Sequence, residues 1–414
     1  RRNVPSVPSS SKSGAASPTR GPLAMTCHCR DPVDQWIAES SESIAKRAVR
    51  ELEALVGVSS PSGDVAGAQE AAAIAAALLP DAAEVEHVPC SSPDHAPDLV
   101  ARVRGSGTGR ILLLGHLDTV IAHAQHRPLT PDPGDPDRLY GSGTVDMKGG
   151  DVLALGTMRA LAQRPERFAE VALLLVVDEE WRVGPFAHVQ RFAGFDACLC
   201  FEAGELTATG DDAVVVKRKA AGTVEVLATG RSSHSGAAPE KGINALLALA
   251  GAAQAIAAQH DPQGPDHLTA VPTVVRSGDA FNVVPADGRL IADVRADRLE
   301  AFARVLDAVP DAVGGATLRA GLAREWPGMD AREATGPLLA RAGELLGRPV
   351  VAAQRGGASD ASHFAATIPL TVDGLGPRGG AAHNPGEFVR ISSLRTRAEV
   401  ALAVALAALE RTTA

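Results

Sequence analysis

The sequence has few aromatic residues and few cysteines. Phe, Trp and Tyr make up 3% of the 414 residues, and the five cysteines are Cys27, Cys29, Cys90, Cys198 and Cys200. So few and scattered thiols do not form a disulfide framework in a chain of this size, which favours a reducing compartment and a cytoplasmic location. Cys27, His28 and Cys29 resemble a metal trio, but no second ligand pair follows at zinc-site spacing. Cys198 and Cys200 alternate within "ACLCF", which is more typical of one face of a buried strand.

Positive charge and long apolar runs are also lacking. The net charge is -9, so a phosphate-backbone partner is not expected. No apolar run approaches the length needed to cross a bilayer, and we expect no membrane partner. Residues 1–30 are rich in Ser, Pro, Arg and Gly without an apolar segment, which predicts a disordered tail rather than a secretory signal. Met25 is then the expected natural start.

Alternation of strands and helices is the main organisation of the chain. Helical spacing is found at 34–56, 66–79, 148–163 and 185–193, and the expected strands are "DLVARVRG", "RILLLGHLDTV", "EVALLLVVDEE" and "DACLCFEAG". Strands that are apolar throughout and separated by helices predict an α/β fold with a mostly parallel sheet covered by helices. A chain of 414 residues, 45% of them hydrophobic, is long enough to form two domains, each with its own core.

The pattern changes near residue 217. An alternating strand in "RKAAGTVEVLATGRSSHSG" is followed by a helix at 242–259, strands at 271–276 and 288–295, and a helix at 297–309. The alternation of helices and apolar strands seen before residue 217 then resumes, with a helix at 334–346, the strand "PLTVDGLGP" and a helix at 391–410. The expected organisation is a disordered tail (1–30), a first domain in two parts (31–217 and 329–414) and an inserted α+β domain (218–328).

Polar side chains gather where the predicted strands of the first domain end. His116 and Asp118 are one residue apart and therefore share a face of an extended chain. The carboxyl ends of parallel strands meet at one edge of a sheet. That edge is expected to hold His116, Asp118, Asp146, Glu179, Glu180, Glu202 and His383. Crowded carboxylates repel one another unless cations are present, and imidazole with carboxylate suits zinc. Each motif taken alone would more often be a solvated acidic turn.

The set as a whole resembles a known family over nearly the whole chain from about residue 40. The motifs are "GHLDTV", "YGSGTVDMKGG", "VVDEEW", "FEAG", "GRSSHSGAAPEKGINALLAL", "FNVVPADGRLIADVR", "GGASDASHFA" and "VDGLGPRGGAAHNPGEFV". Their order and spacing resemble the dinuclear zinc peptidases that include glutamate carboxypeptidase, acetylornithine deacetylase, succinyl-diaminopimelate desuccinylase and aminoacylase. The resemblance is closest to the glutamate carboxypeptidase branch. It implies a zinc-exopeptidase-like catalytic domain with an inserted lid and dimerisation domain, and hence a homodimer.

The resemblance also implies roles for individual residues. Asp146 would bridge two zinc ions, His116 and Glu202 would complete one metal's ligands, and Glu180 and His383 would complete the other's. Cobalt or manganese would fit the same mixed ligand set. Asp118 would accept the free ring N–H of His116, and Glu179 would be the general base. The Asp146–Met147 peptide bond would be cis.

Substrate contacts are implied outside the metal ligands. His234 in the insertion would stabilise the oxyanion, and in dimeric members this histidine reaches the neighbouring subunit's site. Arg295 would hold the substrate's free carboxylate with Asn282 nearby, while Gly357 and Ser359 would lie near the same carboxylate. Taken without the resemblance, His234 would be a solvated surface residue, and Arg295 could instead pair with Asp293 or Asp297 on the surface.

The expected function is therefore metal-dependent amide hydrolysis. The leading hypothesis is a carboxypeptidase that releases a C-terminal amino acid, acidic or polar, from a small peptide or N-acyl amino acid. An N-acyl amino acid deacylase or desuccinylase would use the same machinery. A catalytically silent carboxylate-binding protein would lack at least one ligand or the base, and none is missing. Trp181 and His363 depart from the resembled pattern and could shape the pocket or be mere packing.

Overall fold

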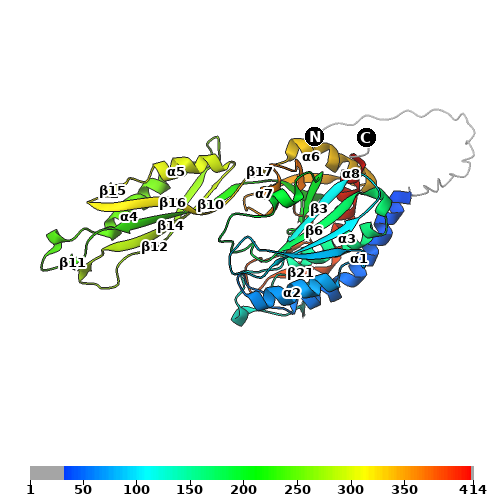
Figure 1. The fold of residues 1–414 in the computed structure, drawn as a ribbon, viewed down its shortest axis with the longest axis horizontal. Coiled ribbons are helices and arrows are strands. Elements are labelled where there is room, and N and C mark those ends of the chain that lie inside the picture. The colour runs from blue at the N-terminus through cyan, green and yellow to red at the C-terminus, as the bar shows by residue number, and fades with distance from the viewer. Residues whose placement is uncertain (1–31, 412–414) are drawn as a thin grey trace, which may run out of the picture.

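The computed structural model describes residues 32–411, and it has two parts. An inserted module, residues 220–326, projects from a larger body formed by the remaining described residues (Figure 1). Each part has a hydrophobic core of its own, and the module's core residues run from Ala220 to Leu318. None of the helices within residues 32–411 combines the length and apolarity needed to span a bilayer.

The body is built on a six-stranded sheet. Its order is β1 (Glu84–Val88), β2 (Asp98–Arg104), β6 (Glu170–Val176), β3 (Arg110–His116), β7 (Ala197–Cys200) and β19 (Leu370–Val372). The pairs β6–β3, β3–β7 and β7–β19 are parallel, whereas β1–β2 and β2–β6 are antiparallel. The mostly parallel sheet of the predicted α/β fold is thereby confirmed.

Helices and loops cover both faces of this sheet, which explains its uninterrupted apolar strands. Leu113 of β3 packs into a core with the long helices, whereas its neighbours Leu112 and Leu114 pack into a second core with Phe192 and Phe364. Successive side chains of a strand point to opposite faces, so a strand buried on both faces must be apolar throughout. The covering helices are α1 (Pro32–Val56), α2 (Val65–Ala77), α3 (Lys148–Ala162), α6 (Arg332–Leu346), α7 (Ala361–Phe364) and α8 (Ile391–Arg411).

Two small sheets complete the body. One contains β17 (Met329–Asp330), β9 (Asp212–Arg218), β18 (Val350–Arg355) and β8 (Glu205–Leu206). The other contains β20 (Gly379–Gly380), β21 (Phe388–Arg390), β5 (Asp135–Tyr140) and β4 (Thr130–Asp132). Pairing of Phe388 with Tyr140 brings the segment after β20 close to the segment after β5.

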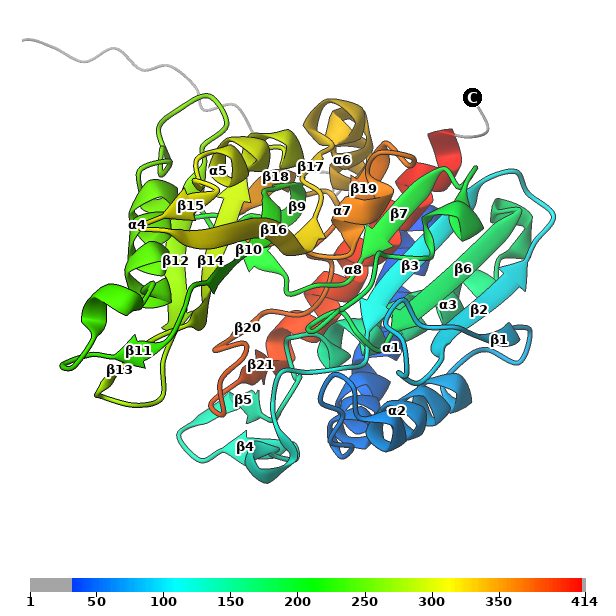
Figure 2. The same cartoon turned by 60° about the vertical axis from the view of Figure 1, so that its left-hand side comes forward.

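The inserted module is an antiparallel sheet covered on one face. The strand order is β12 (Thr269–Arg276), β14 (Asp287–Ala296), β10 (Ala220–Thr229), β16 (Ala316–Trp326) and β15 (Ala312–Val313), and helix α4 (Ala245–Ala257) and α5 (Ala303–Asp307) pack on it. On β14, Leu290, Ala292 and Val294 are buried beneath the helices, while the residues between them are partly exposed. A small pair, β11 (Ser233–His234) with β13 (Val283–Val284), lies at the module's end away from the body (Figures 1 and 2).

Several predicted elements are wrong in detail. Residues 185–193 contain only a short 3-10 turn, Val189–Phe192, because Phe186 stacks on His363 and holds this segment in a loop over the body. The helix expected at 297–309 divides into a 3-10 turn, Leu299–Phe302, and the short α5. The sequence did not predict strands β1, β4, β5, β8, β13, β15, β16, β17, β18, β20 and β21, and "RKAAGTVEVLATG" spans the end of β9 and all of β10. Cys27, His28 and Cys29 lie outside the described residues.

Candidate metal centre

Asp146 lies between two histidines that come from distant parts of the chain. Its Oδ1 is 3.2 Å from His116 Nε2, and its Oδ2 is 3.0 Å from His383 Nε2. Each histidine has a second carboxylate beside it: Glu202 Oε1 is 3.8 Å from His116 Nε2, and Glu180 Oε2 is 3.1 Å from His383 Nε2. Two imidazole–carboxylate pairs joined by one shared carboxylate are the donor set that a bridged pair of metal ions requires.

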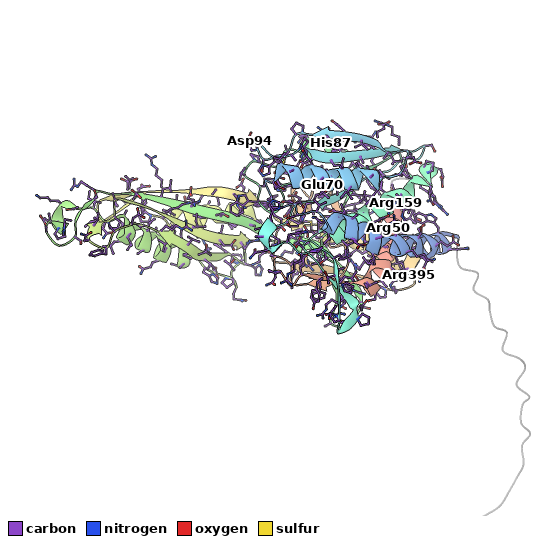
Figure 3. All side chains as sticks on the ribbon, turned by 90° about the horizontal axis from the view of Figure 1, so that it is seen from below. Arg50, Glu70, His87, Asp94, Arg159 and Arg395 are labelled. Carbon is purple, nitrogen blue, oxygen red and sulfur yellow. The ribbon has the colours of Figure 1, made fainter. Side chains whose placement is uncertain are left out.

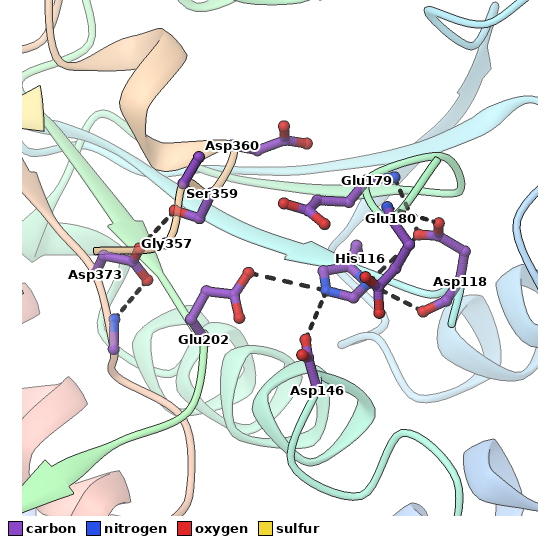
Figure 4. A network of polar contacts seen from close by, with 12 residues as sticks. His116, Asp118, Asp146, Glu179, Glu180, Glu202, Gly357, Ser359, Asp360 and Asp373 are labelled. Atoms are coloured by element: carbon purple, nitrogen blue, oxygen red, sulfur yellow. Dashed lines mark hydrogen bonds and ion pairs between the residues drawn. The ribbon is translucent and has the colours of Figure 1, made fainter. Parts of the chain in front are cut away.

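The body's sheet positions most of these side chains. His116 ends β3, Glu202 follows β7, and Glu179 and Glu180 follow β6, so parallel neighbours deliver their side chains to one edge (Figure 4). Asp118 connects two of these strand ends, since its carboxylate accepts the backbone N–H of Glu179 at 3.2 Å and that of Glu180 at 3.0 Å. The hydroxyl of Ser62 also donates to Asp118. This carboxylate therefore fixes the turn that presents both glutamates.

The His116 ring is oriented by Asp118. Its Nδ1 lies 3.1 Å from the backbone oxygen of Asp118 and 3.4 Å from Oδ1. A proton on Nδ1 donated to these acceptors leaves the Nε2 lone pair facing Asp146 and Glu202, which is the tautomer a metal ligand needs. The geometry agrees with the orienting role expected for Asp118.

Glu387 holds the segment that carries Asp146. Its carboxylate accepts three backbone N–H groups, from Gly143 at 2.9 Å, Val145 at 2.8 Å and Asp146 at 3.0 Å. The Asp146–Met147 peptide bond is cis, as the resemblance implies. Sequence reasoning did not single out Glu387, although it lies four residues after His383 in the same quoted motif. Its three acceptor contacts explain why a carboxylate stands there.

The electrostatics of the cluster call for added positive charge. Burial raises the pKa of Glu202 to about 8, and the charge of Asp146 adds to this rise. Burial likewise raises the pKa of Glu180. Burial also acts to raise the pKa of Asp146, but hydrogen bonds from His116 and His383 outweigh it and hold that pKa below its usual value. Hydrogen bonds to Asp146 and Glu180 raise the pKa of His383 to about 11. The raised pKa values of Glu180 and Glu202 show that this group of carboxylates is stabilised by positive charge next to it.

One oxygen of the cluster has no protein partner. Glu180 Oε1 is buried and accepts no hydrogen bond from any residue in the described part of the chain. His116, Asp146 and Glu180 each offer a ligand atom within 4.8 Å of the others. A buried, unsatisfied carboxylate oxygen beside imidazole nitrogens fits a divalent cation.

Glu179 differs from the other carboxylates of the cluster. Within residues 32–411 its carboxylate makes no hydrogen bond or ion pair, and its side chain reaches toward the space beside Glu202 and His116 (Figure 4). Burial raises the pKa of Glu179 well above its usual value; the charge of His116 opposes this, and that of Asp360 reinforces it. A buried carboxylate with a raised pKa and no partner is suited to accept and release a proton.

Ser359 and Gly357 are engaged elsewhere. Ser359 is fully buried and its hydroxyl donates to Asp373 Oδ2 at 2.6 Å (Figure 4). The Gly357 oxygen accepts from Arg218 at 2.8 Å. Arg218 in turn donates to Asp373 at 2.6 Å. These contacts occupy the Ser359 hydroxyl and the Gly357 carbonyl, and the expected contact of Gly357 and Ser359 with a substrate carboxylate stays a prediction. Both residues belong to a hydrogen-bonded network with Arg218 and Asp373, whose charges act on Glu202.

Two candidate residues of the inserted module, His234 and Asn282, lie apart from the metal centre. His234 and Asn282 are exposed beside β11 and β13, where the backbone N–H of Ser235 donates to the Asn282 oxygen at 2.9 Å. Figures 1 and 3 show this end of the module far from the body. Arg295 lies on the uncovered face of the module's sheet and pairs with Asp293 at 3.0 Å, the alternative left open by the sequence.

The chain belongs to peptidase family M20/M25/M40, because the sequence profile of that family matches residues 112–407. Carboxypeptidase G2 of Pseudomonas sp. (strain RS-16) is 28% identical over 370 residues, which cover 84% of this chain and 86% of that protein. Succinyl-diaminopimelate desuccinylase of Rhodospirillum centenum (strain ATCC 51521 / SW) is 30% identical over 327 residues, covering 73% and 81%. The YXEP protein of Bacillus subtilis, described as a dinuclear metal binding peptidase of the M20 family, superposes with a TM-score of 0.63 at 16% identity, covering 89% of this chain and 99% of that one.

Proposed function

We propose that this member of the family is a dinuclear zinc hydrolase that releases a C-terminal amino acid from a small peptide or an N-acyl amino acid. The observation that carries the proposal is Asp146, whose two carboxylate oxygens face His116 and His383 separately. His116 and Glu202 would hold one zinc ion, and Glu180 and His383 the other. When bound, the two ions would supply Lewis acidity that activates a water molecule and polarises an amide carbonyl.

The remaining chemistry falls to side chains of this protein. Glu179 would take the proton of the attacking water on its carboxylate and later release it to the departing nitrogen, which its raised pKa favours. Arg295 would bind the free carboxylate of the substrate through its planar fork, exchanging its partner Asp293 for the ligand. His234 would donate to the oxyanion after closure of the module or from a second subunit of a homodimer.

An N-acyl amino acid deacylase or desuccinylase is the second candidate. It is favoured by the desuccinylase of Rhodospirillum centenum, which is 30% identical to this chain. Both reactions cut an amide beside a free carboxylate, so the same metal ligands and the same base would serve either one. The side chains around the acyl group and the leaving amino acid would distinguish them.

The test is hydrolysis of a panel of dipeptides and N-acyl amino acids. Protein stripped with a chelator and reloaded with zinc is compared with Glu179→Gln prepared in the same way. We expect the activity of the wild type to return with zinc. The activity of the variant should be lower by about 10³-fold, although both proteins bind the same amount of zinc after reloading. Binding of carboxylate ligands without cleavage of any member would favour the silent binding protein and overturn the proposal.

A further inference from the structure

Trp181 and Arg324 join the body to the inserted module next to the candidate base. Trp181 lies two residues after Glu179, and its side chain is 58% exposed. The guanidinium carbon of Arg324, on β16, lies 4.1 Å from the centre of the Trp181 ring and 5.7 Å from that of Trp326. A guanidinium stacked on an indole keeps its N–H groups, which lie in its own plane, free for another partner.

Arg324 has no acidic partner within the described part of the chain. The two arginines of β14 are paired, Arg295 with Asp293 and Arg289 with Glu225, whereas the more exposed Arg276 and Arg319 of the same sheet make no ion pair within residues 32–411. Arg324, which is partly buried, makes no hydrogen bond or ion pair with any of residues 32–411. A guanidinium offers five N–H donors and no acceptor, so withdrawing it partly from water without a partner costs free energy. An anionic ligand would remove that cost.

Space for such a ligand lies on both sides of Arg324. A cavity of about 560 Å³ lies over the uncovered face of the module's sheet, and its lining includes Trp181 and Ile291 together with three arginines and one carboxylate: Arg276, Arg289, Arg324 and Asp293. A second cavity of about 260 Å³ is bordered by Arg324, Trp326 and His363. In this second cavity, Trp326 Nε1 and His363 Nε2 are buried without a hydrogen-bond partner among the described residues. The larger volume is in the range of small-molecule sites.

The charges around Arg324 connect it with the proposed reaction. Burial lowers the pKa of Arg324, the positive charge of Arg295 lowers it further, and the negative charge of Glu179 opposes both. Arg324 therefore lies within electrostatic reach of the candidate base and of the arginine proposed to hold the substrate's carboxylate. Two like charges that face one region favour a ligand with negative charge there.

We propose that Arg324, stacked on Trp181, binds a second carboxylate of the substrate, which makes the preferred substrate a dianion. This inference rests on the proposed function: Arg295 takes the carboxylate next to the scissile amide, and Arg324 takes the other. The second carboxylate belongs either to the side chain of the leaving amino acid or to the acyl group. The chemistry of recognition, a carboxylate on a guanidinium fork with apolar carbon against the indole, is the same for both sources.

Two matched substrate pairs distinguish these sources. N-acetyl-L-glutamate and N-acetyl-L-glutamine differ by one charge on the leaving side, and N-succinyl-L-alanine and N-succinamoyl-L-alanine differ by one charge on the acyl side. In Arg324→Gln we expect KM to rise by about 10- to 100-fold for the acid of one pair, with a change of about twofold or less for its amide. Arg324→Lys should recover part of the loss, because it keeps the charge without the fork.

Arg319→Gln is the matched control. Arg319 is exposed on the same strand opposite Leu227, away from Trp181, and its substitution should leave both pairs unchanged. Equal losses for acids and amides in Arg324→Gln, or no loss at all, would overturn the assignment of a second carboxylate to Arg324. The thermal midpoint of unfolding is measured for each variant, and a midpoint well below that of the wild type identifies a variant whose fold is destabilised.

A binding measurement separates this inference from the proposed function. The zinc-loaded wild type and variants are titrated with glutarate, and binding is monitored by calorimetry and by tryptophan fluorescence. We expect weaker binding in Arg324→Gln and in Trp181→Ala than in the wild type. Butyrate, with one carboxylate, should bind equally to the wild type and both variants. If the wild type cleaves none of the four amides but shows this pattern, the proposed function fails and the subsite stands. Equal glutarate affinity in the wild type and Arg324→Gln would overturn the subsite.

Discussion

The imidazole of His383 lies 3.0 Å from the carboxylate of Asp146, although Asp146 lies two residues before α3 and His383 belongs to the loop between β20 and β21. Both ends of this contact are held by other parts of the chain. Glu387 accepts the N–H groups before α3, and β21 pairs with β5. The backbone of His383 has a φ of 62°, in the left-handed region that residues other than glycine rarely adopt. The contacts of Glu387 and the pairing of β21 with β5 therefore hold the two side chains together.

Removal of either histidine is expected to lower the zinc stoichiometry from two ions to one. His116 and His383 face different oxygens of Asp146, so each should be needed for one ion only. Zinc content of His116→Ala and His383→Ala, measured by mass spectrometry after dialysis at limiting zinc, checks this. Asp146→Ala should lose both ions. His87→Ala, exposed on β1, is the control. Two ions retained in both histidine variants would contradict the assignment.

Glu387→Ala is expected to lower the free energy of unfolding by about 2–4 kcal/mol, because three backbone N–H groups lose their buried acceptor. Glu387→Gln should lose less, since its carbonyl oxygen can still accept from Val145 and Asp146. Urea unfolding of zinc-free protein measures the effect without the contribution of bound metal. The exposed Glu53→Ala should change it little. Equal stability of Glu387→Ala and the wild type would argue against this role.

Stability is expected to fall in acid through His363. Burial lowers the pKa of His363 from 6.5 to about 4; Asp360 and Asp178 oppose this shift, and Arg182 adds to it. At pH values above about 6.5 the ring is neutral in both states, and the folded protein has its full stability. Between about pH 6.5 and 4 this histidine is protonated in the unfolded chain but still neutral in the folded protein. The free energy of unfolding therefore falls by about 3 kcal/mol over this range.

The comparison of wild type with His363→Phe across this pH range isolates that effect. Phe keeps a ring to stack on Phe186, which lies 4.7 Å away between ring centres, and it cannot be protonated. The variant should gain stability relative to the wild type as pH falls from 6.5 to 4, measured by urea unfolding of zinc-free protein. His87→Gln serves as the control for an exposed histidine. A difference between wild type and His363→Phe that does not vary with pH would contradict the prediction.

The position of His234 predicts complementation between variants. His234 is exposed at the end of the module away from the body, so in an open subunit it does not meet the metal centre (Figure 1). If it acts on a second subunit's site, mixing inactive His234→Ala with inactive Glu179→Gln should restore part of the activity, because one of the mixed sites has both residues. Activity that stays absent after subunits exchange would indicate action within one subunit. Size-exclusion chromatography with light scattering establishes whether dimers form.

The sequence predicted the body's sheet well and the inserted module less well. Strands β3, β6 and β7 are apolar throughout because helices and loops cover both of their faces, and that local pattern is visible without the structure. Strand β16, in contrast, has one exposed face and contains Arg319, Gly321 and Arg324, so its composition resembles a loop. Its pairing with β10 across a long stretch of sequence decides that it is a strand.

For the site, the sequence by itself determined which residue types stand at the ends of the strands and the order in which they occur. His116 ends an apolar strand, Glu179, Glu180 and Glu202 stand shortly after two others, and the carboxyl ends of parallel strands meet at one edge of a sheet. Only the tertiary structure decided which side chains meet. Pairing of β21 with β5 brings His383 to Asp146, Ser359 proves to be buried against Asp373, and Arg324 reaches Trp181. These contacts join segments distant in sequence, and no local pattern encodes them, because they depend on how the sheets and the inserted module pack together.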